Sequence, residues 1–195
     1  MSKEQTRSTL LEAGTRVFHE RGYNHAGIEA IIRAAEVPKG SFYYYFESKE
    51  HFGLAVIDDC AKRYAEEVER HLGDTSLSPL GRLRSYFEAS RGRLESRQCR
   101  SGCIFGNLGQ EMADQSEQIR GRLAEVFSGL IARYAGCLAE AQAAGEIRAD
   151  LDVVALAEFA LGAWQGAILR AKMTRSTAPL QTFLDVLFGS VLRPC

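Results

Sequence analysis

The sequence predicts an all-α protein from three observations. Apolar residues recur at helical spacing along nearly all of the 195 residues. No segment of useful length alternates apolar and polar residues as a half-buried strand does. Breaks such as Val37-Pro38 and the stretch GDTSLSP separate the periodic segments. The expected architecture is a small N-terminal three-helix unit, a connecting helix and a larger helical body.

The first three helices follow from short periodic segments and the residues that break them. Leu10 and Val17 share one face of a helix that Gly22 is expected to end, because glycine readily adopts the left-handed conformation. A second helix begins near Ile28 and stops before Pro38, since the residue before a proline is disfavoured in the α region. Pro38 suits the first turn of a third helix of about two turns.

The remaining helices divide the chain into two expected domains. Ser48 is expected to cap a connecting helix that ends near Leu72, before the turn-rich linker. Residues 1–47 are the expected N-terminal domain, and residues 48–195 are the connecting helix and the body. The further helices are expected at Pro79–Arg97, Cys103–Ala113, Glu117–Ala144, Asp152–Met173 and Pro179–Leu192.

The segment PKGSFYYYF contains five consecutive aromatic residues, from Phe42 to Phe46. On a helix these rings point in all directions, so they cannot all enter one core. Two short helices joined by a tight turn are typical of a helix-turn-helix, whose second helix enters the DNA major groove. We therefore expect Phe42 and Phe46 to pack on the first helix and Tyr43 and Tyr44 to face DNA. The alternative is that all the rings are core.

The residues expected to contact DNA surround the start of this third helix. Gly40 permits a close approach to the groove, while Lys39 and Ser41 suit phosphates or base edges. Lys49 combines a positive side chain with the start of the next helix, which favours a phosphate. The residues expected at the DNA from this reasoning are Pro38, Lys39, Gly40, Ser41, Tyr43, Tyr44 and Lys49. Basic and acidic residues are equally numerous over residues 1–50, so we expect modest non-specific affinity.

The segment GYNHAGIEAIIRAAEVPKGSFYYYFESKEHF resembles the DNA-binding signature of the TetR family of bacterial repressors. The matching residues are Ala35, Val37, Lys39, Gly40, Phe42, Tyr43, Tyr45, Phe46 and Lys49. Glu36 departs from the usual glycine, and Ala26-Gly27 lies where the family usually has a threonine or serine that helps to grip a phosphate. The resemblance makes Gly27 a further candidate for contact with DNA. The resemblance implies a homodimer on double-stranded operator DNA. It also implies a four-helix interface formed by the last two helices and a pocket in the body for a small-molecule inducer.

The body carries a candidate reactive thiol at Cys103. This residue follows Ser101-Gly102 at an expected helix start, where the helix dipole lowers the pKa of a thiol and favours the thiolate. Cys99 is a candidate resolving thiol if the link between the two cysteines is helical. The alternative is that Cys103 is a buried and inert small residue.

The stretches SGCIFGNLGQEMAD and GAILRAKMTRS are similar to a TetR subgroup that includes the repressor of N-ethylmaleimide reductase. In that subgroup the cysteine of the SGC motif is associated with sensing reactive electrophiles and oxidants. The resemblance therefore implies that Cys103 is the sensor, with Lys172 as a candidate neighbour. We expect the change to reach the DNA-binding domain through the connecting helix, from Ser48 to Leu72.

A second interpretation of the body is a pocket for a non-covalent apolar ligand. Its candidate lining residues are Phe87, Phe105, Met112, Phe127, Tyr134 and Trp164, each of which also suits a plain core. The expected dimer face combines small and large residues, because small residues allow two helices to approach closely. These residues are Ala155, Gly162, Ala163, Gly166, Leu184, Leu187, Phe188 and Val191.

Composition and motifs argue against several other classes of protein. The formal net charge is -1, with 46% hydrophobic and 25% charged residues, as in ordinary globular proteins. No apolar run of about 18 residues and no signal peptide is recognised, so we expect a cytoplasmic protein without a membrane partner. The five cysteines lack a zinc-site pattern, and we expect no metal and no cofactor. Enzyme motifs are absent; a cysteine-dependent enzyme using Cys103 and a pure interaction module remain the less favoured alternatives.

Overall fold

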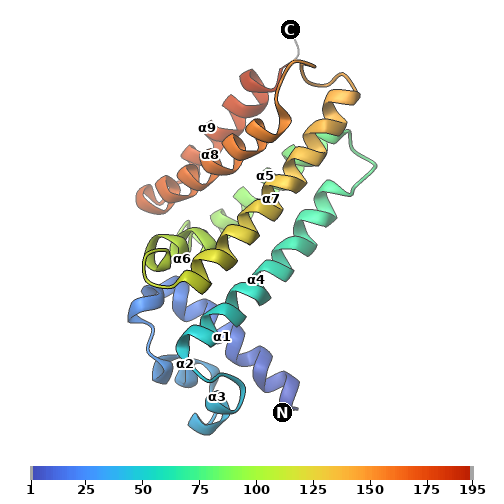
Figure 1. Ribbon diagram of the computed structural model, residues 1–195. Coiled ribbons are helices and arrows are strands. Elements are labelled where there is room, and N and C mark those ends of the chain that lie inside the picture. Colours follow the sequence, from blue (N-terminus) through green and yellow to red (C-terminus); the bar gives the residue numbers. More distant parts are fainter. Residues whose placement is uncertain (1, 194–195) are drawn as a thin grey trace. The chain divides into compact units, whose positions relative to one another are not determined.

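The computed structural model describes residues 2–193, which form helices and connecting segments without a β-strand (Figure 1). This result confirms the predicted all-α fold. The elements in chain order are α1 (Lys3–His25), α2 (Ile28–Ala35), α3 (Lys39–Tyr45), α4 (Lys49–Leu72), α5 (Pro79–Ser96), α6 (Ile104–Met112), α7 (Glu117–Ala143), α8 (Val153–Thr174), α9 (Ala178–Val186) and a terminal π-helix (Leu187–Val191).

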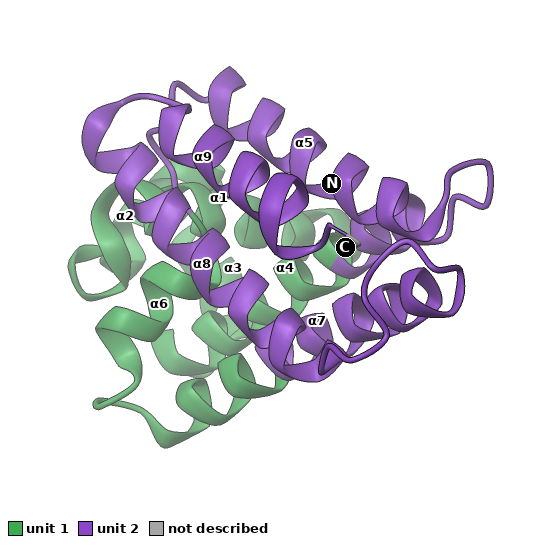
Figure 2. Ribbon diagram, turned by 90° about the horizontal axis from the view of Figure 1, so that it is seen from above, with its two compact units in different colours: residues 1–64, 103–125 green, residues 65–102, 126–195 purple. Residues whose placement is uncertain are grey.

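The chain divides into two compact units (Figure 2). Unit 1 contains residues 1–64 and 103–125, and unit 2 contains residues 65–102 and 126–195. Helices α1, α2, α3 and α6 therefore belong to unit 1, whereas α5, α8 and α9 belong to unit 2. Helices α4 and α7 each contribute residues to both units. The grouping of α6 with the N-terminal helices is a long-range feature that helical periodicity does not reveal.

The core of unit 1 is an aromatic cluster. Phe42, Phe46 and Phe52 are at most 1% exposed, and their ring centroids lie 4.8–5.6 Å apart. Phe18 of α1 adds an edge-on contact to Phe52 at 5.9 Å. Such tilted and edge-to-face ring pairs are favourable beyond the apolar area that they bury. The prediction that Phe42 and Phe46 are core residues is confirmed, but the ring that both contact is Phe52 of α4, and Phe18 of α1 reaches the cluster through Phe52.

Several helix ends follow the predicted local chemistry. The Ser48 hydroxyl accepts the His51 backbone N–H at 3.0 Å at the start of α4. At α8 the Asp152 carboxylate accepts the N–H groups of Val154 and Ala155. Gly22 has a positive φ of +75° but a ψ of 167°, so it is not the predicted left-handed cap, and one further helical turn follows it, up to His25. The glycine therefore kinks α1 near its end and does not terminate it.

The core of unit 2 is a second aromatic cluster. The ring of Phe87 lies 5.4 Å from Tyr134, 5.1 Å from Trp164 and 4.9 Å from Phe183, measured between centroids. Phe87, Tyr134 and Trp164 are fully buried. These side chains come from α5, α7, α8 and α9, so the cluster joins the helices of unit 2 around one core.

The last two helices differ from the sequence-based expectation in two ways. Helix α8 is long and apolar enough, by length and composition alone, to cross a membrane, although no such run was recognised from the sequence. This is weak evidence of a membrane span, because the core helices of soluble proteins pass the same test. The predicted single helix at Pro179–Leu192 is instead α9 followed by the π-helix at Leu187–Val191.

Candidate DNA-binding surface and candidate sensor

Helices α2 and α3 form a helix-turn-helix whose turn contains one residue in the left-handed conformation. Glu36 has φ 54° and ψ 40°, and the following Val37 N–H donates to the Ile32 carbonyl at 3.3 Å. This hydrogen bond closes the end of α2 as in a Schellman motif. A side chain with a Cβ is disfavoured in this conformation, which explains the glycine usual at this position in the resembled family.

Replacing Glu36 with glycine is expected to stabilise the protein by about 1 kcal/mol, because the left-handed turn then carries no Cβ. For a chain of this length the melting temperature should rise by about 2–4 °C. Calorimetry of Glu36→Gly and Glu36→Gln measures this effect. The glutamine variant keeps the Cβ and should melt like the wild type; equal melting of both variants would show that the turn is not strained.

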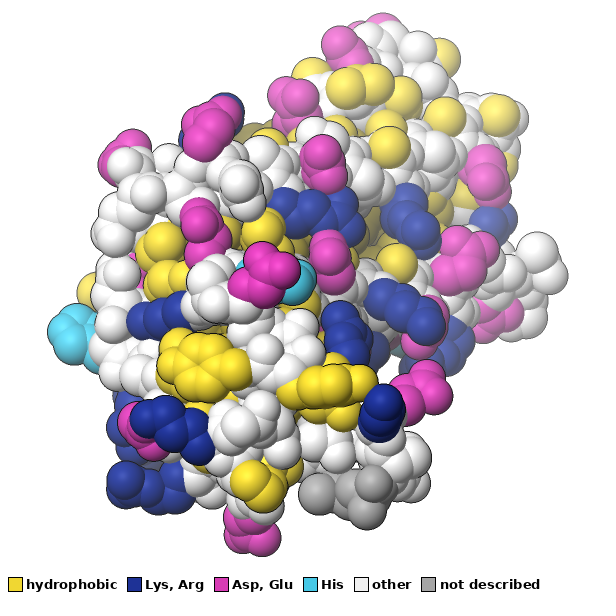
Figure 3. All heavy atoms as spheres, turned by 60° about the horizontal axis from the view of Figure 1, so that its bottom comes forward, with side chains coloured by type: hydrophobic (Ala, Val, Ile, Leu, Met, Phe, Trp, Pro, Cys, Tyr) yellow, Lys and Arg dark blue, Asp and Glu magenta, His cyan; other side chains and the backbone are white. Residues whose placement is uncertain are grey.

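The aromatic residues of α3 divide between the core and the surface. Tyr43 is 52% exposed and Tyr44 is 63% exposed, whereas Phe42 is fully buried. The Tyr45 hydroxyl donates to the Lys3 carbonyl at 2.7 Å, so this ring anchors α3 to the start of α1. Figure 3 views the molecule with the bottom of the Figure 1 view brought forward. On this face, hydrophobic side chains are exposed among Lys, Arg, Asp and Glu side chains. The structure therefore excludes the alternative that all the rings are core.

The other predicted residues at α3 lie open on the surface. Pro38, Lys39 and Gly40 are exposed and Ser41 is half-buried, and a Cβ added at Gly40 would meet nothing within 4 Å. Gly27 is also exposed, at the N-terminal end of α2. These positions are accessible to a DNA duplex, as their predicted roles require.

The ammonium group of Lys39 forms an ion pair with Glu29 of α2 at 2.5 Å. Hydrogen bonding and attraction by Glu29 raise the pKa of Lys39 above its usual value. Both side chains are more than 60% exposed, so solvent screens the pair and a phosphate can compete for the lysine. Sequence reasoning did not single out Glu29, because its partner lies on a different helix.

Lys49 lies against the protein more closely than its predicted phosphate role suggests. Its ammonium group donates to the Asn24 carbonyl at 3.3 Å and lies 4.5 Å from the centre of the Tyr23 ring. Burial lowers the pKa of Lys49, while the Glu111 carboxylate opposes that shift. Lys49 therefore holds the end of α1, and its contact with phosphate stays a prediction.

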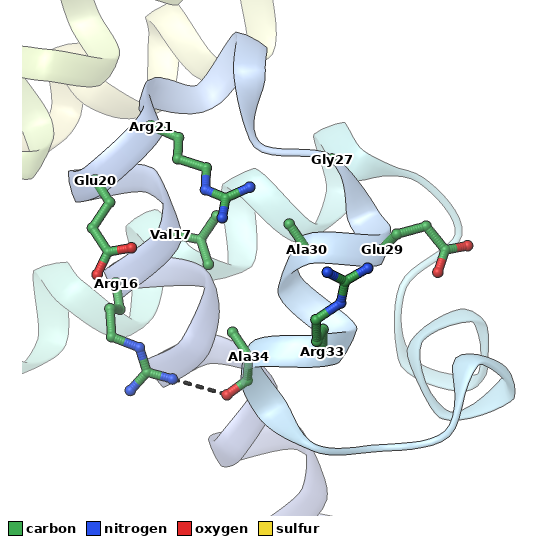
Figure 4. Close-up of a pocket in the computed structure, with 9 residues that line it drawn as sticks. All are labelled: Arg16, Val17, Glu20, Arg21, Gly27, Glu29, Ala30, Arg33 and Ala34. Atoms are coloured by element: carbon green, nitrogen blue, oxygen red, sulfur yellow. Dashed lines mark hydrogen bonds between the residues drawn. The ribbon is translucent and has the colours of Figure 1, made fainter.

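A groove of about 420 Å³ lies between α1 and α2 in unit 1 (Figure 4). Figure 4 shows the guanidinium groups of Arg21 and Arg33 reaching toward the space between the two helices, whereas Glu29 points away from it. Arg16, a third arginine of the lining, donates to the Ala34 carbonyl at 2.9 Å. Gly27 also belongs to the lining. The groove thus places basic side chains beside the predicted phosphate position at Gly27. The sequence did not show this proximity, because the residues lie on two different helices.

Changing Tyr43 to phenylalanine is expected to weaken operator binding about tenfold, through loss of a hydrogen bond to a charged phosphate. The melting temperature should not change, because the hydroxyl is lost from an exposed ring. Tyr45→Phe is the matched control. It removes the bond to Lys3 and should instead lower the free energy of unfolding by about 1 kcal/mol, with little effect on DNA affinity. Fluorescence anisotropy and thermal melts test the pair, and an unchanged affinity of Tyr43→Phe would contradict the assignment.

Cys103 is the N-cap residue of α6 and is partly exposed. Its carbonyl accepts the Asn107 N–H at 2.9 Å, so the helix begins directly after the thiol, as predicted. A thiol at this position lies at the positive end of the helix dipole. Cys103 belongs to unit 1, together with the helix-turn-helix, and not to the same unit as the rest of the body.

The helical link that Cys99 would need to act as a resolving thiol for Cys103 is not present. Residues 97–103 are not helical, and Gln98, Cys99 and Gly102 have positive φ angles. The side chain of Cys99 is 3% exposed, and its carbonyl accepts the Arg175 guanidinium at 3.2 Å. The helical spacing that would have made Cys99 a resolving thiol is therefore absent.

The other cysteines in the described part of the chain are buried. Burial raises the pKa of the Cys137 thiol to about 11, and this thiol donates to the Pro79 carbonyl at 3.0 Å. Cys60 accepts a hydrogen bond from Arg63 at 3.4 Å. Cys195 lies outside the described residues. Among residues 2–193, Cys103 is thus the most accessible thiol.

The remaining candidate sensor residues belong to different units. Phe105 is buried in unit 1, edge-on to Tyr64 at 5.8 Å, whereas Trp164 is fully buried in the aromatic core of unit 2. Lys172 is half-buried near the end of α8, also in unit 2. Its role beside Cys103 stays a prediction. Among residues 2–193 no cluster of three or more His, Cys, Asp or Glu side chains is arranged to hold a metal ion.

An all-helical chain with an exposed, aromatic-rich helix-turn-helix is a DNA-binding regulator by its architecture. Residues 10–56 match the family described as bacterial regulatory proteins, tetR family, and residues 79–187 match the tetracyclin repressor-like C-terminal domain. The chain belongs to the TetR family of transcriptional regulators, which are DNA-binding proteins and not enzymes.

Three relatives illustrate this membership. The transcriptional repressor DhaR of Mycobacterium sp. strain GP1 is 40% identical over 192 residues, covering 98% of this chain and 95% of DhaR. A regulatory protein TetR from Rhodobacter sphaeroides has a crystal structure with a TM-score of 0.90 at 40% identity, covering 95% of this chain and 97% of that one. The repressor NemR of Escherichia coli K12 is 30% identical over 193 residues, covering 99% of this chain and 97% of NemR. The crystal structure of its reduced form has a TM-score of 0.88, covering 95% of this chain and 96% of that one.

Proposed function

We propose that this protein is a cytoplasmic homodimeric repressor that binds a pseudo-palindromic operator and is released when a reactive electrophile or oxidant modifies Cys103. The observation that carries the sensing role is the position of Cys103, which is partly exposed at the start of α6 in the same unit as the helix-turn-helix. The buried state of Cys60, Cys99 and Cys137 supports this choice of thiol. Similarity to NemR, whose solved structure is described as a reduced form, agrees with it.

The chemistry proposed for an electrophile is a conjugate addition. With N-ethylmaleimide, the Cys103 thiolate sulfur forms a bond to one alkene carbon, and the C=C π bond breaks. The other alkene carbon takes a proton from solvent, which leaves a thioether and no further product. No redox partner is needed for this step.

An apolar face on α8 and α9 supports the homodimer. Val154, Phe159, Leu169 and Met173 of α8 and Val186 of α9 are 44–75% exposed. Gly162 and Gly166 of α8 are exposed as well, and a Cβ added at either would meet nothing within 4 Å, so a second helix can approach closely. In the proposed dimer a second copy of the chain covers this face. Two-fold symmetric dimers of this kind are the commonest homo-oligomers.

The predicted dimer residues of the C-terminal segment require a correction. Leu184, Leu187 and Phe188 are buried within unit 2, so they hold α9 and the π-helix in place and do not form a free face. The small residues Ala155, Gly162 and Gly166 of α8 are exposed, as their proposed role requires. The proposed interface is therefore built mainly on α8.

Replacing Phe159 with glutamate is expected to convert the dimer to a monomer at micromolar concentration, because an unpaired charge would be buried at the interface. Light scattering measures the mass. Leu77→Glu is the matched control: Leu77 is 39% exposed outside α8 and α9, and this variant should stay dimeric. A monomeric wild type, with or without DNA, would refute the proposal.

A second candidate function is induction by a non-covalent apolar ligand. The indole N–H of Trp164 favours it, since this group is fully buried without an acceptor among residues 2–193. Buried donors usually have partners, and a ligand carrying an acceptor would supply one. Retention of the inducer response by a protein without Cys103 would favour this candidate.

The test of the proposed function is a selection of bound fragments from genomic DNA, followed by footprinting and titration with N-ethylmaleimide. We expect a pseudo-palindromic site whose half-sites are about 10 base pairs apart or a multiple of that spacing. We also expect release of this fragment after stoichiometric alkylation. Failure to recover any DNA would favour a pure interaction module, and catalytic consumption of the electrophile would favour a cysteine-dependent enzyme.

A further inference from the structure

Helix α6 packs against α1 within unit 1. Cys103 lies at the N-terminal end of α6, and Glu111 lies in the last turn of this helix. The helix has nine residues, so the two ends are about 13 Å apart along its axis. A rigid element of this length transmits a displacement at one end to the contacts made at the other.

Glu111 contacts the backbone of α1 directly. Its carboxylate accepts the Asn24 N–H at 3.0 Å, in the short turn of helix that follows the kink at Gly22. A Cβ built at Gly22 would lie 2.6 Å and 2.9 Å from the two oxygens of the same carboxylate. The absence of a side chain at Gly22 is therefore what leaves room for Glu111.

Lys49 holds the same peptide segment from α4. Its ammonium group donates to the Asn24 carbonyl at 3.3 Å, while Glu111 accepts from the Asn24 N–H. Both polar groups of the Asn24 backbone are thus held by charged side chains of other helices. Hydrogen bonds to charged partners are stronger than those between neutral groups.

The backbone segment around Asn24 connects α1 to the helix-turn-helix. Three residues after Asn24, Gly27 is the N-cap of α2, and Gly27 also lines the arginine-bearing groove beside α1. The Asn24 backbone therefore lies directly before the start of α2. Helix α3 packs against both α1 and α2, so it follows any change in their arrangement.

We propose that Glu111 is a positioning residue for operator binding: its carboxylate ties α6, which begins at Cys103, to the backbone turn that leads from α1 into α2. The positioning role follows from the contacts alone, and the link to Cys103 rests on the proposed function. An adduct at the start of α6 displaces the helix and withdraws the Glu111 carboxylate from Asn24. The turn before α2 then loses one of its two fixed contacts.

The experiment compares Glu111→Ala, Glu111→Gln and the wild type in the full-length protein. Glutamine retains an oxygen that can accept the Asn24 N–H, so it tests the hydrogen bond separately from the charge. Asp114→Ala is the matched control, because it removes an exposed carboxylate just after α6. If the alanine variant does not fold, Glu111→Asp replaces it, since it keeps the charge and withdraws the oxygens by one carbon.

Three measurements are made well below the melting temperature: hydrogen exchange of the Asn24 amide, operator affinity by anisotropy, and the ratio of affinities before and after N-ethylmaleimide. We expect Glu111→Ala to accelerate exchange at Asn24 and to weaken operator binding about tenfold, or about 1.4 kcal/mol. Glu111→Gln and Asp114→Ala should remain within about threefold of the wild type. In Glu111→Ala, N-ethylmaleimide should change the operator affinity less than it does in the wild type, because the hydrogen bond from Asn24 to Glu111 is already absent.

Unchanged exchange at Asn24, or operator affinity in Glu111→Ala equal to that in Asp114→Ala, would overturn the proposal. A purely structural Glu111 would lower the melting temperature without changing the affinity of the folded protein. If N-ethylmaleimide fails to release the wild type, the sensing role of Cys103 fails. The comparison of unmodified variants would still decide the positioning role of Glu111.

Discussion

Replacing Cys103 with serine is expected to preserve operator binding and to abolish release by N-ethylmaleimide, quinones or hypochlorite. Serine keeps a small polar side chain at the N-cap of α6 but is not a comparable nucleophile. To change a population from mostly binding-competent to mostly incompetent, the adduct must favour the incompetent state by about 5.5 kcal/mol. An adduct packed at the start of α6 is expected to supply this difference through overpacking and lost contacts.

The controls for this prediction are the other cysteines and Lys172. Cys60→Ser, Cys99→Ser, Cys137→Ser and Cys195→Ser should keep both DNA binding and release, the first three because these thiols are buried. Lys172→Ala should weaken the response only if its ammonium group stabilises the thiolate. Anisotropy titrations of each variant with the electrophile measure the effect. Full release of Cys103→Ser at wild-type doses would refute the thiol mechanism and favour the non-covalent ligand.

Replacing Phe42 with alanine is expected to lower the free energy of unfolding by about 3–5 kcal/mol, as for other fully buried phenylalanines. The ring is 0% exposed and packs against Phe46 and Phe52, so its loss leaves a cavity at the centre of the N-terminal unit. Urea unfolding followed by circular dichroism measures the change. A loss of this size would remove a large part of the stability of a typical domain.

Tyr44→Ala is the matched control for the Phe42 variant. Its ring is 63% exposed on the same short helix, so its removal should change the unfolding free energy much less. At temperatures where both variants are folded, Tyr44→Ala should bind the operator more weakly than Phe42→Ala. Equal stabilities would mean that the division of the rings between core and surface is wrong.

The structure offers a second candidate route from Cys103 to the DNA-binding helices. From the sequence, α4 was the continuous link between the N-terminal domain and the body, so we expected it to carry the change. In the structure, α6 packs on α1 within unit 1, and Glu111 contacts Asn24 directly. The proposed change at Cys103 therefore has a candidate route through α6, formed by residues distant in sequence, and the role of α4 stays a prediction.

The helices, their caps and the helix-turn-helix were determined by the sequence itself. Helical periodicity and the Ser48 cap depend on neighbouring residues, so local chemistry suffices to predict them. The division of the rings followed from the same local geometry, because consecutive side chains on a helix cannot share one face.

Only the tertiary structure decided which distant residues act together. The grouping of residues 103–125 with residues 1–64 and the inward position of Lys49 depend on segments distant in sequence, and the bond between Glu111 and Asn24 spans 87 residues. Pairings of this kind depend on how whole helices pack, and a charged residue such as Glu111 looks in the sequence like any solvated side chain. For the same reason, the nonhelical link between Cys99 and Cys103 could not be distinguished from a helical one by residue spacing.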